Sequence, residues 1–353
     1  MEQLNSAFTL FMSLMVEAMP FLLLGVLFSG LLQFFVSERR LMSLMPKNPF
    51  LGSLVGSSIG FLFPVCECGN IPVARRLLLQ GAPASVAIGF LLAAPTINPI
   101  VFWATWVAFR DQPEIVFLRI GLSLAIATTI GWIFSLQKDL RPFLRPALAT
   151  ALTVRQQRLT QVVEKPELTI LQTQKNPLLQ SGTFFLGQSN PAAQSPQPAA
   201  NDPLALQLMM MDIEKQPIGL RLRLLVESMA QEVRELAAVL IFGSAIAAIL
   251  QVFVPRELVL SLGQNSIMSI VAMMLLAAIV SICSTVDSFF ALSFSSLFTT
   301  GSLVSFLVFG PMIDLKGIGL MLSIFRPRAI FYLFAIAGQL TFLAALILNL
   351  YIT

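Results

Sequence analysis

The chain has no histidine, only three cysteines and two tyrosines, and just 11% charged residues over 353 positions. Soluble domains carry about 25% charged residues, so this composition excludes an ordinary soluble globular protein. The missing histidine removes the commonest metal ligand and the usual proton shuttle at neutral pH. Any ion chemistry must use Cys, Asp, Glu, Asn or backbone carbonyls, and we expect no cofactor.

Hydrophobic residues dominate the chain. Hydrophobic residues make up 56% of it, and the mean hydropathy is +0.83. Long apolar runs separated by short loops predict an all-α polytopic membrane protein whose solvent is the lipid bilayer. The net charge of +4 comes from short loops and one polar middle segment. We therefore interpret it as a topology signal and expect no nucleic-acid partner.

Composition divides the chain into three parts. Residues 1–136 and 229–353 are predicted to be transmembrane repeats, and residues 137–228 are predicted to be a linker. Gln, Pro, Ser and Asn dominate the later part of that linker, which is typical of disordered segments. We expect a tether between the two halves. The alternative is a docking site for a companion membrane protein, and a homodimer is also open.

A carboxylate stands between two thiols in Cys66-Glu67-Cys68-Gly69. This stretch is predicted to be a polar turn between the short apolar segments Pro49–Pro64 and Ile71–Gln80, which form either a re-entrant hairpin or two spanning helices. An acidic residue at membrane depth is a functional-site hypothesis by default. The non-functional alternative is that Cys66 and Cys68 are buried and act only as small hydrophobic residues.

Three further interruptions break apolar runs. Ala94–Pro99 contains Asn98, Cys283–Ser288 contains Thr285 and Asp287, and Gly310–Asp314 ends in an acid. Polar groups and prolines in membrane helices typically open the backbone toward a protein-lined cavity. These interruptions are therefore predicted to line a site.

The interruptions recur at nearly one spacing, which indicates an internal repeat. Cys283 follows Cys66 by 217 positions (283 − 66), and Pro311 follows Pro95 by 216 (311 − 95), which pairs Asn98 with Asp314. The basic linker and the Arg326–Arg328 loop are placed in the cytoplasm. Each half then crosses an odd number of times. We expect two inverted repeats of about four to five membrane segments each, with interrupted or re-entrant helices at their centres.

In an inverted repeat the three cysteines would meet near the midplane. Converging thiolates suit soft species such as trivalent arsenic, Cu(I) or Zn, so Cys66, Cys68 and Cys283 are the predicted metal ligands. Glu67, Asp287 and Asp314 are predicted to carry protons or a coupling cation. We expect no catalytic residues. The predicted substrate-binding residues are Cys66, Glu67, Cys68, Asn70, Asn98, Cys283, Thr285, Asp287 and Asp314.

The motifs also carry a resemblance. Phe63–Pro72, Ala94–Pro99 and Cys283–Asp287 resemble the bacterial permease family that includes the ArsP-like organoarsenical efflux permeases, over roughly 10–134 and 229–350. The resemblance implies an inner-membrane permease with about eight to ten membrane segments and no ATPase of its own. ArsP-like members export trivalent methylated arsenicals through cysteine thiols. The sequence itself contains no Gly-x4-Gly-Lys-Ser/Thr motif.

The leading hypothesis is a secondary transporter that exports a small thiophilic solute, metal or metalloid, such as a trivalent organoarsenical, and is not an enzyme. Arg75 and Arg76 are predicted to be interfacial anchors or substrate contacts. Three alternatives stay open. They are a permease for another metal ion or an organic anion with structural cysteines, an intramembrane thiol oxidoreductase, and a membrane scaffold subunit.

Overall fold

The computed structural model describes residues 2–35, 46, 48–62, 66–137, 142–146, 148–150, 152–153, 218–253, 266–295 and 297–352. Its contacts divide the chain into two compact units, Met1–Arg145 with Met229–Thr353, and Pro146–Ser228. In the first unit, Met1–Arg145 is called the first half and Met229–Thr353 the second half. Most of the predicted linker, Phe63–Val65 and the predicted Arg39–Arg40 loop lie outside the described residues.

Helices account for nearly all of the described residues in the first half. They are α1 (Glu2–Phe35), α3 (Pro49–Ile59) with the short 3₁₀ helix η1 (Gly60–Leu62), α4 (Glu67–Leu79), α5 (Ala84–Ile97), α6 (Pro99–Ala108) and α7 (Pro113–Ser135). The predicted break in the Ala84–Phe109 helix falls at Asn98, between α5 and α6.

The second half follows the same order. Its helices are α10 (Ile218–Phe253, which begins in the other unit), α12 (Ser266–Val280), α13 (Asp287–Leu292), α14 (Thr300–Met312), α15 (Leu315–Met321) and α16 (Pro327–Ile352). The predicted Phe289–Phe298 segment is helical only to Leu292 and continues as turns. The predicted Gly310–Asp314 break separates α14 from α15.

Proline and glycine set several helix ends. Proline occupies the first turn of α3, α6 and α7, where its missing N–H costs no hydrogen bond. After α4, Gly81 has φ 85°, a conformation that glycine adopts without strain. Its N–H donates to Leu78 O, and the Ala82 N–H donates to Leu77 O. This is a Schellman-type end, and it turns the chain directly into α5.

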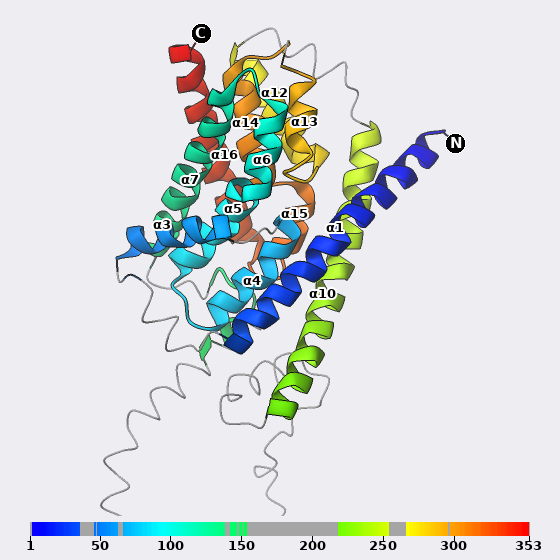
Figure 1. Cartoon of the computed structure of the whole chain (residues 1–353), viewed down its shortest axis with the longest axis vertical. Coiled ribbons are helices and arrows are strands. Elements are labelled where there is room, and N and C mark those ends of the chain that lie inside the picture. The colour runs from blue at the N-terminus through cyan, green and yellow to red at the C-terminus, as the bar shows by residue number, and fades with distance from the viewer. Residues whose placement is uncertain are drawn as a thin grey trace, which may run out of the picture. The chain divides into compact units, whose positions relative to one another are not determined.

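The helices of each half pack in the same pattern. In the first half α5 packs on α3 and α7, and in the second half α14 packs on α12 and α16. Between the halves, α5 contacts α14, α7 contacts α16, α4 contacts α15 and α6 contacts α13. Figure 1 shows α5 near the centre of this unit, with α6 and α13 on one side of it and α4 on the other.

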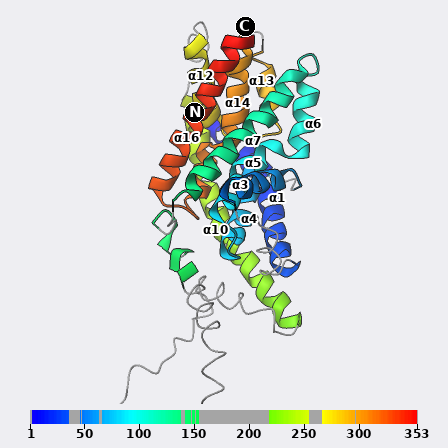
Figure 2. The same cartoon turned by 90° about the vertical axis from the view of Figure 1, so that its left-hand side faces the viewer.

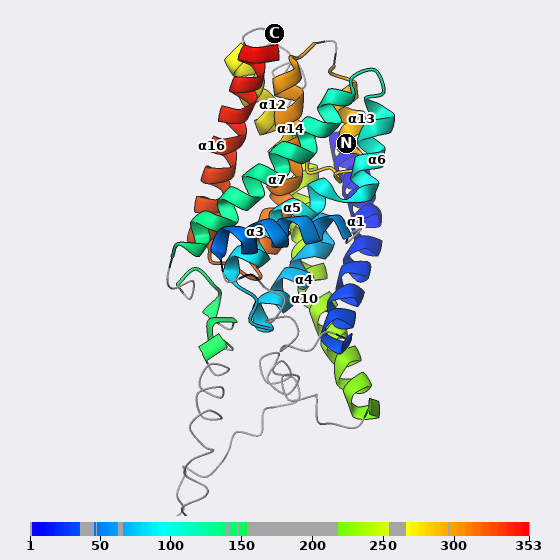
Figure 3. The ribbon, with the colours of Figure 1, turned by 60° about the vertical axis from the view of Figure 1, so that its left-hand side comes forward.

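The helices α7 and α16, which contact each other, run in opposite directions. The views in Figures 1 and 3 show α7 descending while α16 ascends. Two backbone hydrogen bonds join the segment that follows α7 to the segment that precedes α16. The Arg145 N–H donates to Ile324 O at 2.9 Å, and the Arg326 N–H donates to Phe143 O at 2.8 Å.

The Gly- and Ser-rich stretch after Pro49 forms a close helix contact, as predicted. α3 buries Gly52, Ser53, Gly56 and Ser57 against α5 and α7. Small side chains allow such close backbone approach. The Ser53 hydroxyl donates to Thr128 O on α7 at 2.8 Å. Figure 2 views α3 nearly end-on and Figure 1 views it from the side, so α3 lies crosswise to α7.

Five helical segments among the described residues are long and apolar enough to cross a membrane: Asn5–Leu31, Ala84–Ala108, Pro113–Ser135, Thr300–Met321 and Pro327–Tyr351. Pro49–Leu62 and Ile267–Val280 are shorter apolar helices. The described residues contain no β-strand. The predicted all-α polytopic fold is confirmed. A helix such as α3, with 11 residues, rises about 16 Å against a hydrocarbon core of about 30 Å.

Candidate functional site

The Cys66–Gly69 stretch is the first turn of a helix, and the prediction of a turn outside regular structure was wrong. Cys66 occupies the N-cap position of α4, and Glu67 opens the helix. The Gly69 and Asn70 N–H groups both donate to Cys66 O at 3.1 Å. Glu67 lies in the first turn, where the helix dipole favours an acidic side chain.

Gly69 fixes the position of this turn against α1. A Cβ atom at Gly25 would overlap the backbone of Gly69, so the two glycines bring α1 and α4 into direct backbone contact. Three residues beyond Gly69, Pro72 O accepts a hydrogen bond from the Ser29 hydroxyl at 3.3 Å. The thiols are therefore carried on a helix end that α1 holds in place.

In the second half, the helix breaks just before Cys283. α12 ends at Val280, and Ser281 has φ 46°, a left-handed conformation that costs an L-residue about 1–2 kcal/mol. The chain resumes helical geometry at Asp287, whose N–H donates to Cys283 O at 3.0 Å. An interruption is present here, but it runs from Ser281 to Val286, so the predicted bounds Cys283–Ser288 were two residues late at each end, and Asp287 and Ser288 belong to α13.

The three cysteines from the two halves lie together. The Cys66 thiol lies within interaction range of the thiols of Cys283 and Cys68. All three are free thiols, exposed by 7%, 1% and 5% for Cys66, Cys68 and Cys283. The Thr285 hydroxyl contacts Cys283 Sγ at 3.6 Å. The fold thus brings these four predicted residues into one cluster.

Asn98 and Asp314 occupy equivalent positions at the two helix breaks. Asn98 Oδ1 accepts from the N–H groups of Ile100 and Val101 at 2.7 and 3.3 Å and caps α6. Asp314 Oδ1 accepts from the Gly317 N–H at 2.6 Å and caps α15. Both residues are buried. The pairing predicted from the repeat spacing therefore corresponds to one shared structural role.

A buried lysine that was not predicted lies beside the thiols and carboxylates. Lys316 Nζ donates to Ser281 O at 3.1 Å, and its charge interacts with Glu67, Asp314 and the thiols of Cys68 and Cys283. Glu67 Oε1 and Asp314 Oδ2 are buried without a hydrogen-bond partner among the described residues. The sequence signal that could have identified Lys316 is a lysine inside an apolar segment.

Asn70 fastens α4 to α5. Its Nδ2 donates to Leu91 O at 2.7 Å, while its Oδ1 has no hydrogen-bond partner among the described residues. Asn70 and Asp287 are 217 positions apart (287 − 70), the same spacing that relates Cys66 to Cys283. Asn70 also follows Cys68 by only two residues. The structure therefore gives this predicted residue a helix-packing contact.

Asp287 is the centre of a buried network that joins the halves. Its Oδ2 accepts from Arg119 at 2.9 Å, and Arg119 also donates to Thr105 and Ser288 at 2.8 Å each and to Ser284 O at 3.2 Å. Arg119 was missed as a candidate. The signal was a lone arginine inside the apolar Ile115–Leu136 run.

Arg75 and Arg76 form ion pairs with α10, so neither predicted role describes them fully. Arg76 lies 3.2 Å from Glu232, with both side chains buried. Arg75 lies 3.0 Å from Glu235 at the more exposed edge. These pairs connect the end of α4 in the first half with the second half.

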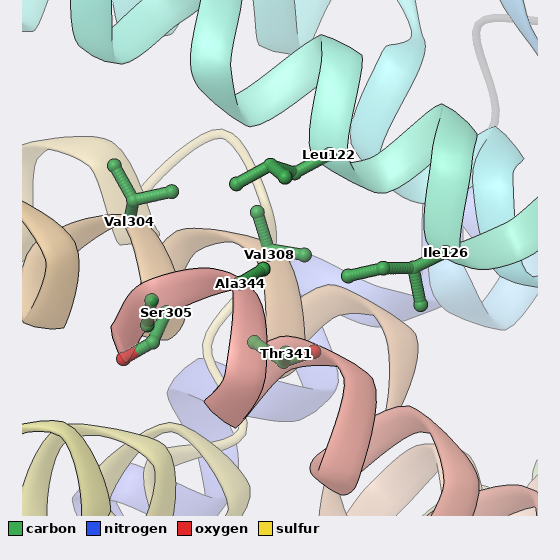
Figure 4. A pocket seen from close by; sticks show the side chains of 8 residues that line it. Leu122, Ile126, Val304, Ser305, Val308, Thr341 and Ala344 are labelled. Atoms are coloured by element: carbon green, nitrogen blue, oxygen red, sulfur yellow. The ribbon is translucent and has the colours of Figure 1, made fainter. Parts of the chain in front are cut away.

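Two hollows described for this unit are lined by other residues than Cys66, Cys68 and Cys283. One, shown in Figure 4, has no room for a water molecule and is lined by Leu122, Ile126, Val304, Ser305, Val308, Thr341, Ala344 and Ala345. Its hydroxyls bond to their own helices, Ser305 to Ser302 O and Thr341 to Ala337 O. Among the described residues, no group of three or more His, Cys, Asp or Glu side chains is arranged to hold a metal ion. Metal ligation by the three cysteines stays a prediction.

Comparisons with known proteins place the chain in a family. Residues 3–350 match the ArsP_1 family model, described as a predicted permease. The "UPF0718 protein YcgR" of Bacillus subtilis (strain 168) is 38% identical over 94% of this chain and 92% of its own length. A protein of Streptococcus mutans serotype c (strain ATCC 700610 / UA159) is 30% identical over 91% of this chain and 87% of its own, and is named "Putative two-component membrane permease complex subunit".

No solved structure matches the chain. The family match covers both halves with their apolar helices, and the relatives are aligned over almost their full lengths. These findings indicate a transporter and not an enzyme. The protein belongs to the ArsP_1 family of predicted permeases and is a multi-pass membrane permease.

Proposed function

We propose that this permease is a secondary transporter that exports a small thiophilic solute, with the site formed where Cys66, Cys68 and Cys283 meet. The observation that carries the proposal is the convergence of thiols from both halves, buried together beside Glu67. Soft metal or metalloid species, including trivalent organoarsenicals, bind two or three such sulfurs. Buried inert cysteines would need neither the shared location nor an adjacent acid.

The proposal includes two inverted repeats. It is supported by the matching helix order, by the equivalent caps at Asn98 and Asp314, and by the reciprocal contacts α4–α15 and α6–α13. The opposite directions of α7 and α16 favour an axis in the membrane plane. Transporters of this kind move one repeat against the other around a fixed central site.

Two sets of ion pairs that join the halves suit alternating access. Arg76 and Glu232 lie near the turn where the Ala84–Ala108 span begins, and Arg119 contacts Thr105 near its end. The pairs therefore belong to opposite ends of one span. In this proposal, each set closes one side of the site, and each opens in turn.

The proposed membrane orientation and ion carriers follow from the charged residues, and the proposed companion subunit follows from the printed name of a relative. We place the permease in the inner membrane with residues 137–228 on the cytoplasmic side, because the linker and the Arg326–Arg328 loop are basic. Glu67 and Asp314, each with one oxygen lacking a hydrogen-bond partner among the described residues, are the proposed carriers of a proton or coupling cation. The Streptococcus mutans relative's printed name favours a companion subunit for this chain as well.

Transport into everted membrane vesicles tests the proposal. Vesicles with the wild-type protein are compared with empty-vector vesicles for uptake of trivalent phenylarsenical, antimonite, Cu(I) and Zn(II). At least one solute is expected to accumulate, and Cys66→Ser with Cys68→Ser is expected to abolish its uptake without lowering the amount of folded protein. Normal uptake by the double variant would show that the thiols are not part of the site.

A further inference from the structure

The backbone is strained at the break that follows α12. Among the residues that the structure describes, Ser281 is the single non-glycine residue with a positive φ, at 46°. An L-residue adopts this left-handed conformation at a cost, and such strain persists only where the surroundings hold it in place. Ser281 is also buried, with 1% exposure. The contacts of Ser281 therefore show what maintains the break.

Two hydrogen bonds join Ser281 to the start of α15. Lys316 Nζ donates to Ser281 O at 3.1 Å, and the Leu315 N–H donates to Ser281 Oγ at 3.1 Å. The first turn of α15 is closed by Asp314, whose Oδ1 accepts from the Gly317 N–H at 2.6 Å. The break between α14 and α15 therefore holds the break between α12 and α13.

α15 itself gives no reason for a lysine at position 316. The residue lies in the first turn of the helix, where a basic side chain opposes the helix dipole, and it is only 3% exposed. A buried amino group needs an acceptor, and the flexible four-carbon stem of Lys316 reaches Ser281 O. Carbonyl groups just past a helix end lack helical partners, and lysine side chains can satisfy them. The lysine thus serves the end of α12.

Cys283 lies between two anchored points. Ser281, two residues before it, is held by α15. Asp287, four residues after it, donates its N–H to Cys283 O at 3.0 Å and accepts from Arg119 through its side chain at 2.9 Å. The location of the Cys283 thiol therefore depends on both anchors, and the first of them includes Lys316.

We propose that Lys316 is a positioning residue, which holds the left-handed break through its hydrogen bond to Ser281 O and thereby keeps the Cys283 thiol in place against the thiols of the first half. This inference rests on the proposed function, in which Cys283 binds the solute. Lys316 acts through the backbone of the break and not on the solute. Without its donor, Ser281 relaxes toward the right-handed region and Cys283 is displaced.

Alkylation of the thiols by N-ethylmaleimide, a neutral reagent, tests the proposal. Rates at Cys283 and Cys68 are read by mass spectrometry in the full-length protein in proteoliposomes. Lys316→Met removes the donor and keeps the side-chain length, and it is expected to raise the Cys283 rate about tenfold, the effect of losing one buried hydrogen bond. Cys68 is the internal control and is expected to keep its rate.

Lys316→Arg keeps a donor and is expected to restore the wild-type rate at Cys283. Arg328→Met, at an exposed position near the start of α16, is the matched control and is expected to change nothing. Glycine adopts φ 46° without strain, so Ser281→Gly should make the break independent of Lys316. In that background Lys316→Met is expected to change the Cys283 rate by no more than about twofold.

An unchanged Cys283 rate in Lys316→Met overturns the proposal, and so does absence of reaction at Cys283 in both proteins. An equal rise at Cys68, an equal effect of Lys316→Arg, or a full effect in the Ser281→Gly background also overturns it. If Lys316→Met alone does not fold, Ser281→Gly with Lys316→Met is expected to fold, and its failure would contradict the proposal.

The labelling experiment needs no transported solute, so its outcome is separable from the vesicle experiment. Normal transport by the cysteine variants together with the expected labelling pattern would remove the thiol site and keep Lys316 as the residue that positions Cys283. Thiol-dependent transport together with an unchanged Cys283 rate in Lys316→Met would keep the site and remove the role of Lys316.

Discussion

Asn98 and Asp314 have the same structural task but different charges. Each of the two residues caps the second part of a broken helix with a side-chain oxygen. Of the two, it is Asp314 that interacts electrostatically with Lys316 and Glu67. The cap is therefore a property of both halves, while the charge belongs to one. This difference allows capping and charge to be separated by substitution.

Asn98→Ala is expected to destabilise the protein by about 1 kcal/mol, the usual cost of losing an N-cap side chain. Asn98→Asp is expected to keep most of the stability, because the cap oxygen remains. Thermal unfolding in detergent, followed by loss of the monodisperse peak, gives the comparison. Equal loss in both variants would show that the amide makes contacts more important than the cap.

Asp287 and Arg119 should behave as a mutually dependent pair. Asp287→Ala leaves the Arg119 charge buried, and we expect a loss of about 3–5 kcal/mol. Replacing both by apolar residues, as in Arg119→Met with Asp287→Leu, should recover much of that stability. Thermal unfolding of the two single variants and the double variant measures this. A double variant less stable than both singles would contradict the pairing.

At the scale of elements, short polar interruptions decide where helices end. The breaks at Asn98 and near Asp314, the short helices α3 and α4 and the end of α4 at Gly81 were predictable, because proline, glycine and capping residues act locally. The helical conformation of Cys66–Gly69 was not, because the Gly25–Gly69 contact that holds it joins positions far apart in the sequence.

The candidate site shows the same limit. The convergence of Cys66 with Cys283 was predictable from the repeat spacing, but the partners of the buried charges were not. Arg119 pairs with a residue of the other half, and Lys316 lies beside Glu67 only because α4 packs on α15. Side-chain partners between halves depend on packing geometry that local patterns do not encode.

The contact between α4 and α10 offers a prediction about elements. Glu232→Ala should reduce transport by about tenfold, because it removes the carboxylate that lies 3.2 Å from the buried Arg76 guanidinium. Exchanging the charges with Arg76→Glu and Glu232→Arg should restore a substantial part of the rate. The same exchange at the more exposed pair Arg75–Glu235 is the control and should have a smaller effect. No recovery in the exchanged variant would contradict a role for the pair itself.

At the scale of the whole molecule, we expect both halves to form the site, and we expect the segment between them to act as a tether. The first unit unites Met1–Arg145 with Met229–Thr353, so the proposed site needs both halves. The interpretation of residues 137–228 as a tether stays a prediction from composition, because most of them lie outside the described residues.

Deleting Thr160–Asn201 is expected to leave transport within about twofold of wild type, because we interpret this segment as a tether, and the closure free energy of a tether changes only slightly with its length. Uptake into everted vesicles at matched expression measures it. A deletion that folds but does not transport would favour the alternative that this segment docks a companion protein. Co-purification with and without the deletion would then identify that contact.

The central claim is that thiols of the two halves form one site, and a double-mutant cycle on transport tests it most directly. Cys66→Ser, Cys283→Ser and the pair are compared for uptake of the transported solute at equal amounts of folded protein. Because the two thiols lie within interaction range of each other, we expect each single change to cost about as much as both together. Independent, additive losses, or normal uptake by all three variants, would contradict a shared site.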